Sequence, residues 1–348
     1  MQQSADSMRT KPPRAMTTLE VLAVIAICGL LLAMILPALQ AARESSRRIH
    51  CASNLREVGY ALHGYLLANR VFPPALPAID GDPRKGGNAW YSPQAQLIPY
   101  MEQRQLASEF DVRVPISPSL LGSFSGGAAP GKPERVRIDV FLCPSDPAVG
   151  RSGPGNSFRA CTGPGAYAAE GSTLSPGGGL GAFTPLVPHA PSDFTDGLSA
   201  TVGISEKAIG SADLVKFRMR TDFWYSGAGQ FGSPLATDAM VALCGAASTW
   251  TPPSYSAFAG STWLYAGYDN SWYNHAVSPN QPIPDCSSLP GPMSAAASIG
   301  GVFRASSYHP GGVNCLLMDG SSRFIADGID IFVWRAASTR ANHDTAPL

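Results

Sequence analysis

Seven cysteines carry the most obvious chemistry of this 348-residue chain. Cys28 lies in an apolar stretch, and the other six are dispersed: Cys51, Cys143, Cys161, Cys244, Cys286 and Cys315. In an oxidising compartment an even number of cysteines indicates disulfides, although the spacing alone leaves their connectivity open. No pair has the Cys-x-x-Cys or Cys/His spacing of a zinc site, so the sequence predicts no zinc centre.

Sequence motifs of known enzyme classes do not support a catalytic role. Residues 227–232 match the Gly-x-Gly-x-x-Gly pattern, but Pro234 stands where the phosphate-binding helix would begin. The sequence has no Gly-x-Ser-x-Gly, His-Glu-x-x-His or Walker motif. We therefore expect a protein that is not an enzyme and that holds no cofactor.

Glu20 is the one charged residue in the apolar run from Met16 to Leu36. As a helix this run would extend about 31 Å, which is enough to cross the hydrocarbon core of a bilayer. A buried carboxylate there is costly unless it is paired. Glu20 is therefore either a functional group that seeks a cation or a residue that reaches the aqueous interface.

The distribution of charge indicates an exported protein. Acidic and basic residues balance at 25 each, whereas a nucleic-acid-binding protein needs a basic surplus. Arg9, Lys11 and Arg14 precede the apolar run, and only Asp6 opposes them, which predicts a cytoplasmic N-terminus. The chain after residue 40 then lies outside the cytoplasm.

An amphipathic segment follows Pro37. Apolar residues recur at steps of three and four, at Ile49, Ala52, Leu55, Gly59, Leu62 and Leu66. This spacing predicts one buried helix face. We expect a single helix over about 17–69, kinked at Pro37 and ended by the Phe-Pro-Pro segment at 72–74.

The remaining sequence predicts short strands between loops rich in glycine and proline. The candidate strands are 136–142, 200–205, 214–223, 313–318 and 323–325. No alternating strand–helix pattern indicates a parallel sheet. The expected fold class is α+β. The long helix covers residues 16–70, and its amphipathic half packs on an antiparallel sheet. A large, loop-rich β domain then covers 71–348, with an aromatic-rich insertion at 207–300.

Residues 14–21, R-A-M-T-T-L-E-V, resemble the signal of type IV prepilins and type II secretion pseudopilins. In those proteins a membrane peptidase cuts before a hydrophobic residue and methylates the new N-terminus, and the acid at the fifth mature position guides assembly. The resemblance implies a leader peptide at 1–15, cleavage between Ala15 and Met16, and Glu20 as the assembly residue. Ala15 stands where the family usually has Gly.

An ordinary secretory signal peptide is the alternative, because small residues at 38–42 offer a cleavage site. The apolar run is longer than the core of such peptides, and an acid near its start fits them poorly. We therefore favour the prepilin interpretation.

Ordered blocks farther along resemble DUF1559, a bacterial family of large prepilin-like proteins. The blocks are Ala41–Glu44, Arg47–Cys51, Asn54–Leu55, Phe72–Pro74, Phe141–Pro147, Asp193–Ser199 followed by Glu206, and an H-X9-DG element from His309 to Asp319-Gly320. Each block is weak alone, but their order along the chain is specific. The segment 207–300 matches no block.

This resemblance implies a structural subunit, major or minor, of a type IV pilus or type II secretion pseudopilus-like filament. It implies prepilin peptidase and other pilin-like subunits as partners, with membrane lipid around residues 16–36 and no nucleic acid. The expected location is the inner membrane, as a single-pass protein with an extracytoplasmic C-terminal domain that can also stand in a filament.

A glycan-binding module is the competing function. Four tryptophans gather in the unmatched segment, at positions 224, 250, 263 and 272. If these tryptophans are exposed, they could stack on sugar rings, and the chain would be a membrane-anchored binding module. Buried, they would pack the core of the β region, as large aromatic residues usually do.

The matching blocks also suggest disulfides. Cys51 and Cys143 lie in such blocks, on the helix and on a strand expected to cover it, and are the first candidate pair. Cys244 and Cys286 share the unmatched segment and are the second pair. Cys315 alternates with apolar residues and fits a buried thiol.

Calcium, which some pseudopilins bind, is the one metal that the resemblance suggests. Asp193, Asp196 and Glu206 could supply the oxygen ligands. The alternative for the two aspartates is an Asp-Gly turn that follows a strand.

The H-X9-DG element predicts architecture and not a catalytic dyad. Asp319-Gly320 is a signal for a two-residue type I′ hairpin, which would set Cys315 opposite Phe324 and Leu317 opposite Ser322. His309 then lies at the far end of the strand, near a Pro-Gly-Gly turn and out of reach of Asp319 in the same chain. A contact between His309 of one subunit and Asp319 of another subunit is the remaining alternative.

Overall fold

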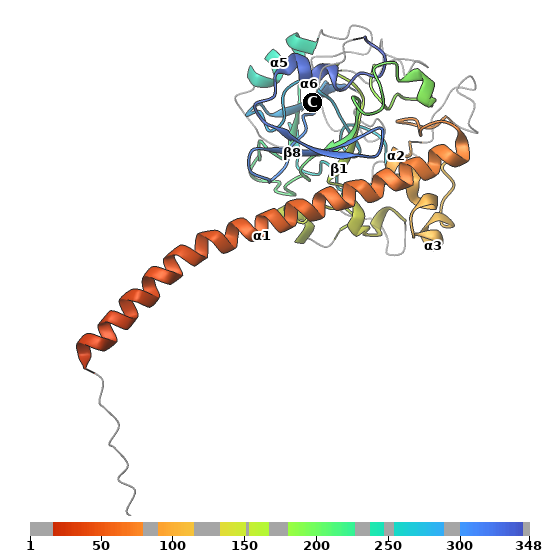
Figure 1. Ribbon diagram of the computed structural model, residues 1–348. Coiled ribbons are helices and arrows are strands. Elements are labelled where there is room, and N and C mark those ends of the chain that lie inside the picture. The colour runs from red at the N-terminus through yellow and green to blue at the C-terminus, as the bar shows by residue number, and fades with distance from the viewer. Residues whose placement is uncertain are drawn as a thin grey trace, which may run out of the picture. The chain divides into compact units, whose positions relative to one another are not determined.

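The computed structural model describes residues 17–78, 90–114, 133–150, 153–166, 180–226, 237–246, 254–288 and 300–343 (Figure 1). The chain forms two compact units, which divide between Ser46 and Arg47 inside a long N-terminal helix. After this helix come two mixed β-sheets in a loop-rich domain, so the fold class is α+β as expected. The predicted cleavage residues Ala15 and Met16 lie outside the described residues.

Helix α1 (Thr18–Asn69) begins at a reciprocal capping box. The Thr17 N–H donates to the Glu20 carboxylate at 2.8 Å, and the Glu20 N–H donates to the Thr17 hydroxyl oxygen at 3.3 Å. Both backbone donors would otherwise lack a partner within the helix. Glu20 thus has a local structural role at the first turn.

The first half of α1 carries large apolar side chains that are exposed, among them Leu22, Leu31 and Ile35. By length and composition the helix can cross a membrane. It continues through Pro37, which removes one backbone hydrogen bond without ending the helix. The predicted extent of the helix is confirmed.

The second half of α1 buries one face in the β domain. Leu55 and Leu62 are fully buried, which confirms the centre of the predicted apolar stripe, and Val58 is buried as well. Ile49 is 63% exposed, so its place in that stripe was wrong. It precedes the buried Cys51 by two residues, about 200° around a helix, and therefore lies on the other side.

Five strands form the first sheet, in the order β5-β1-β2-β8-β9. Their bounds are β1 (Phe158–Cys161), β2 (Val202–Glu206), β5 (Trp272–Tyr273), β8 (Gly312–Leu317) and β9 (Ser322–Ala326). The β1–β5 pair is parallel, and the other neighbours are antiparallel. The expectation of a purely antiparallel sheet is wrong at this edge, where a long connection and not a hairpin brings β5 beside β1.

The second sheet has the order β4-β3-β6-β7. Its strands are β3 (Phe223–Tyr225), β4 (Tyr255–Ser256), β6 (Asp285–Ser287) and β7 (Gly301–Val302). The β3–β6 pair is again parallel. Both sheets therefore depart from the antiparallel expectation.

Three of the five predicted strands are confirmed, as β2, β8 and β9, and two are wrong. Within 136–142 a 3₁₀ turn begins at Asp139, a residue that favours turns. Across 214–222 the chain turns because carboxylates hold its backbone: Asp213 accepts from Val215 and Lys216, and Asp222 accepts from Arg218. These local bonds compete with a strand ladder.

The other helical segments are short. They are α2 (Pro93–Leu97), η3 (Ile98–Tyr100), α3 (Arg104–Ala107), η4 (Pro133–Arg135), η5 (Asp139–Phe141), η6 (Pro147–Gly150), η7 (Pro191–Asp193), α5 (Thr237–Ala246) and α6 (Ile331–Ala336). Of these, η7 and α5 lie between strands along the chain, and α6 follows β9.

Aromatic residues of the segment 207–300 fill the main core. Trp263 and Trp272 are fully buried and belong to the same apolar cluster as Leu55 and Leu62 of α1. Trp224 is half-buried, and Trp250 lies outside the described residues. This segment supplies strands to both sheets and packs the core beneath the helix.

The β8–β9 hairpin has a turn that differs from the predicted one. The Gly320 N–H donates to the Leu317 carbonyl, and the Leu317 N–H donates to the Ser321 carbonyl. Only Gly320 of the Asp-Gly pair has a positive φ, of 88°. This pattern is a three-residue loop with a glycine bulge and not a type I′ turn.

The bulge shifts the register of the hairpin by one residue. Cys315 pairs with Arg323, and Leu316 pairs with Ser322, so both predicted pairings were wrong. The two-residue loop assumed from Asp-Gly omitted Met318, which belongs to the turn.

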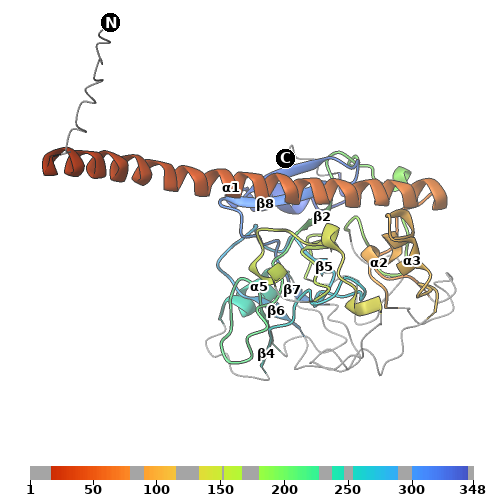
Figure 2. The ribbon, with the colours of Figure 1, turned by 90° about the horizontal axis from the view of Figure 1, so that it is seen from below.

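The tip of this hairpin touches α1, and Figures 1 and 2 show the two lying side by side. A Cβ on Gly59 would lie 3.3 Å from the Gly320 carbonyl oxygen and 3.0 Å from Leu316. The absence of a side chain at both glycines permits this close approach of helix and turn. The Asp-Gly pair is thus a packing element.

We predict that Gly320→Ala destabilises the folded chain by about 1–2 kcal/mol, because an L side chain is disfavoured at positive φ. Its Cβ would also lie 3.3 Å from the His63 ring. Gly328→Ala is the matched control, since nothing lies within 4 Å of the added Cβ. Chemical unfolding in detergent measures both variants, and equal midpoints would contradict the prediction.

Candidate functional site

The carboxylate of Glu206, at the end of β2, lies in the interior and is only 1% exposed. It accepts hydrogen bonds from the Asn314 backbone N–H at 2.7 Å and the Asn314 side-chain amide at 3.0 Å. His309 Nε2 lies 3.1 Å from Glu206 Oε1. Pairing of β2 with β8 brings these residues together, and the bonds offset the cost of burying the charge.

His309 lies three residues before β8, where the Ser307 hydroxyl oxygen accepts its backbone N–H at 3.1 Å. Asp319 lies after the other end of β8, and its carboxylate accepts from Ser321 at the hairpin tip. The strand separates the two motif residues, so they form no dyad within the chain, as the sequence predicted. The acid beside His309 is Glu206.

Both predicted disulfides are present: Cys51–Cys143 and Cys244–Cys286. The first joins the second half of α1 to the segment after η5. Cys143 Sγ also lies 3.4 Å from His309 Nε2. The disulfide and the Glu206–His309 pair are therefore in direct contact.

Three cysteines stay free: Cys28, Cys161 and Cys315. Burial raises the pKa of the Cys161 thiol to about 12, and it also raises the pKa of Cys315. These two thiols are neutral and shielded, so they act as small apolar core residues. The buried-thiol interpretation of Cys315 is confirmed.

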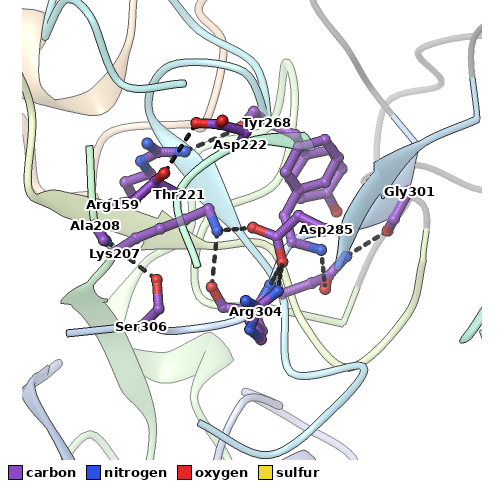
Figure 3. Close-up of polar contacts among 12 residues, drawn as sticks. Arg159, Lys207, Ala208, Thr221, Asp222, Tyr268, Asp285, Gly301, Arg304 and Ser306 are labelled. Atoms are coloured by element: carbon purple, nitrogen blue, oxygen red, sulfur yellow. Dashed lines mark hydrogen bonds and ion pairs between the residues drawn. The ribbon is translucent and has the colours of Figure 1, made fainter. Parts of the chain in front are cut away.

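A buried ion cluster centres on Asp285 of β6 (Figure 3). Its carboxylate accepts from Lys207 Nζ and, at 2.6 Å, from Arg304 Nη1. Burial lowers the pKa of Lys207 to about 7, although Asp285 acts in the opposite direction. The fully buried Arg159 donates to the Tyr268 carbonyl, and burial lowers its pKa to about 10.

A small pocket lies where the disulfide and this ion cluster approach each other. Cys143, Glu206, Lys207 and Ser306 line it. Tyr308 is also in its wall and is 37% exposed, so the pocket adjoins the surface.

The calcium candidates do not share a site. Asp196 accepts from Thr339, Asn342 and His343, which anchors the C-terminal segment. Asp193 accepts from Ala190 at the start of η7. Glu206 is committed to His309 and Asn314, and among the described residues these three acids form no common metal-binding group. The predicted calcium site is therefore wrong. The carboxylates of Asp193 and Asp196 instead accept hydrogen bonds from the backbone and side chains of turns and segment ends.

Sequence reasoning missed the links between these residues. It named Glu206, His309 and Cys143 in separate blocks, but it assigned no role to Asn314, Lys207, Asp285 or Arg304. The one feature of the sequence that connects the two groups of residues is that Lys207 directly follows Glu206 in the chain. Nothing in the linear spacing indicated that β6 would meet the end of β2.

Residues 40–331 match the family described as "Protein of unknown function (DUF1559)". The match covers most of the chain and includes Glu206, His309 and the cysteines of both disulfides, so the chain belongs to the DUF1559 family. Searches of curated proteins and of solved structures find no match.

The pKa of Lys207 predicts how stability changes with pH. Between pH 7 and its ordinary pKa of 10.5, the folded chain keeps Lys207 neutral while the unfolded chain binds a proton there. The free energy of unfolding therefore rises with pH in this window, and the rise ceases below about pH 7 where both states are protonated.

Lys207→Met should remove this rise. Lys216→Met, which changes an exposed lysine, should keep it. Urea unfolding of both variants and the unmodified chain across the window measures the slopes. Parallel slopes for the Lys207 variant and the unmodified chain would show that Lys207 does not titrate as inferred.

Proposed function

We propose that this chain is a structural, non-enzymatic subunit of a type IV pilus or type II secretion pseudopilus-like filament. The observation that carries the proposal is the single helix α1. Its apolar half exposes large side chains, and its other half buries one face in the β domain. A subunit of this kind offers the apolar half to lipid before assembly and to neighbouring helices afterwards.

The resemblance of residues 14–21 to a prepilin signal and membership of the DUF1559 family support the same proposal. The basic residues before the helix favour a cytoplasmic N-terminus, so the β domain would be outside the inner membrane. The expected partners are prepilin peptidase and further pilin-like subunits. Disulfides in the β domain accord with an oxidising compartment.

Of the large aromatic side chains on which the glycan-binding alternative depends, most of those that the structure describes are buried. Trp263, Tyr265, Tyr268, Trp272 and Tyr273 are all buried. Stacking on a sugar ring needs an accessible aromatic face. Among the described residues this segment is a packing element, and we do not propose glycan binding.

We predict that a prepilin peptidase cuts between Ala15 and Met16. Co-expression should yield a chain that begins with methylated Met16, as read by mass spectrometry of the mature N-terminus. Ala15→Gly restores the usual residue of the signal and should be processed at least as completely. A mature chain that begins near Ala42 would instead establish a conventional signal peptide.

We predict that the charge of Glu20 acts in assembly and not in folding. An unpaired carboxylate in lipid should bind the N-terminal ammonium of a neighbouring processed subunit. Glu20→Gln removes the charge but keeps an acceptor for the Thr17 capping box, so the helix should persist. Incorporation into sheared filaments should fall while the membrane-inserted amount stays unchanged.

Glu57→Gln is the matched control, because Glu57 is an exposed acid on the other half of the same helix. Its incorporation should equal that of the unmodified chain. If Glu20→Gln assembles normally while Glu20→Leu does not, the capping box and not the charge explains the acid.

A further inference from the structure

Side chains from four separate segments converge beside the pocket. They are Cys51 of α1, Cys143 after η5, Glu206 of β2 and His309 before β8, here called the Cys–Glu–His cluster. One ligand-capable atom from each residue lies within 4.8 Å of the others. All four residues are buried, which excludes bulk solvent from the point where these atoms meet.

Two of the separations are close to edges of a zinc coordination tetrahedron, and the two sulfur atoms, bonded to each other in the oxidised chain, would move apart on reduction. Ideal bond lengths place a sulfur and a nitrogen ligand about 3.6 Å apart, and a nitrogen and an oxygen ligand about 3.4 Å apart. In the structure Cys143 Sγ lies 3.4 Å from His309 Nε2, and His309 Nε2 lies 3.1 Å from Glu206 Oε1. The same ring nitrogen faces both neighbours, so one ion could contact all of them.

We propose that the Cys–Glu–His cluster binds one zinc(II) ion when its disulfide is reduced. Two thiolates, one imidazole and one carboxylate form a donor set that suits zinc in a closed tetrahedral site. The oxidised and the metal-bound forms are mutually exclusive, because the same two sulfur atoms either bond to each other or bind the ion.

The chemistry balances without electron transfer to the metal. A dithiol reduces the Cys51–Cys143 disulfide to two thiols and is itself oxidised to a disulfide. Zinc(II) then binds both sulfur atoms as thiolates, and two protons leave to solvent. His309 binds through Nε2 with its ring proton on Nδ1, so Glu206 exchanges a hydrogen bond for a bond to the ion.

Two further features favour this site over a purely structural disulfide. Asn314 holds the Glu206 carboxylate with two hydrogen bonds, so one ligand is already oriented before metal arrives. A small pocket lined by Cys143 and Glu206 also adjoins the cluster. In the reduced chain the ion would join α1 to the β domain as the disulfide does in the oxidised chain.

This inference is independent of the filament role, and metal titration of the full-length chain in detergent tests it. The chain is reduced with a phosphine, freed of reductant and titrated with cobalt(II), whose thiolate charge-transfer bands report sulfur ligation. We expect one cobalt(II) per reduced chain, displacement by zinc(II), and no binding to the oxidised chain.

Matched variants separate the cluster from other thiols. The reduced Cys143→Ser variant and the reduced unmodified chain both lack the Cys51–Cys143 disulfide, but only the variant lacks one metal ligand. The variant should therefore lose the cobalt bands. His309→Gln should lose them too. Cys315→Ser removes a buried thiol outside the cluster and should bind cobalt(II) as the unmodified chain does.

The outcomes decide the proposal. Charge-transfer bands that persist in Cys143→Ser, or that vanish in Cys315→Ser, would place the metal elsewhere and overturn it. A reduced, folded chain without cobalt bands would also overturn it, with circular dichroism reporting the fold. Loss of helical signal on reduction, not reversed by zinc(II), would equally count against a site that replaces the disulfide.

Discussion

A buried carboxylate must be fully hydrogen-bonded or it destabilises the fold, and Glu206 is the place where this chain meets that constraint. Its partners are a backbone N–H and a side-chain amide of β8 together with the imidazole of His309. These bonds fix the end of β2 against the start of β8. They also set His309 against Cys143, and so connect the sheet to the disulfide that holds α1.

The next residue along the chain, Lys207, extends the same arrangement with a basic side chain. Lys207 pairs with Asp285 of β6, and Arg304, just beyond β7, pairs with the same carboxylate. The dipeptide Glu206-Lys207 therefore links the five-stranded sheet to both the helix anchor and the four-stranded sheet. A buried ion pair is weak evidence for stability, because the cost of desolvating its charges can exceed their attraction. We infer that this cluster instead holds together the elements that it joins.

The proposed role as a filament subunit needs this rigidity. A subunit anchored through the first half of α1 carries its β domain on the second half, so that half must stay fixed to the domain. The disulfide, the buried stripe around Leu55 and Leu62, and the approach of Gly59 to Gly320 all serve that attachment. A zinc ion in the Cys–Glu–His cluster would preserve it under reducing conditions.

Local patterns in the sequence were enough to predict several features of the fold. The apolar run, the helical spacing after Pro37 and the Asp-Gly pair predicted α1 and the β8–β9 hairpin, because period and turn chemistry are properties of neighbouring residues. Ordered blocks also pointed to the Cys51–Cys143 disulfide and the family. Tertiary structure decided the rest. The parallel β1–β5 and β3–β6 pairs, the one-residue register shift at Gly320, and the meeting of His309 with Glu206 and Cys143 join residues far apart in the chain. Such contacts follow from how whole elements pack, which no local spacing encodes.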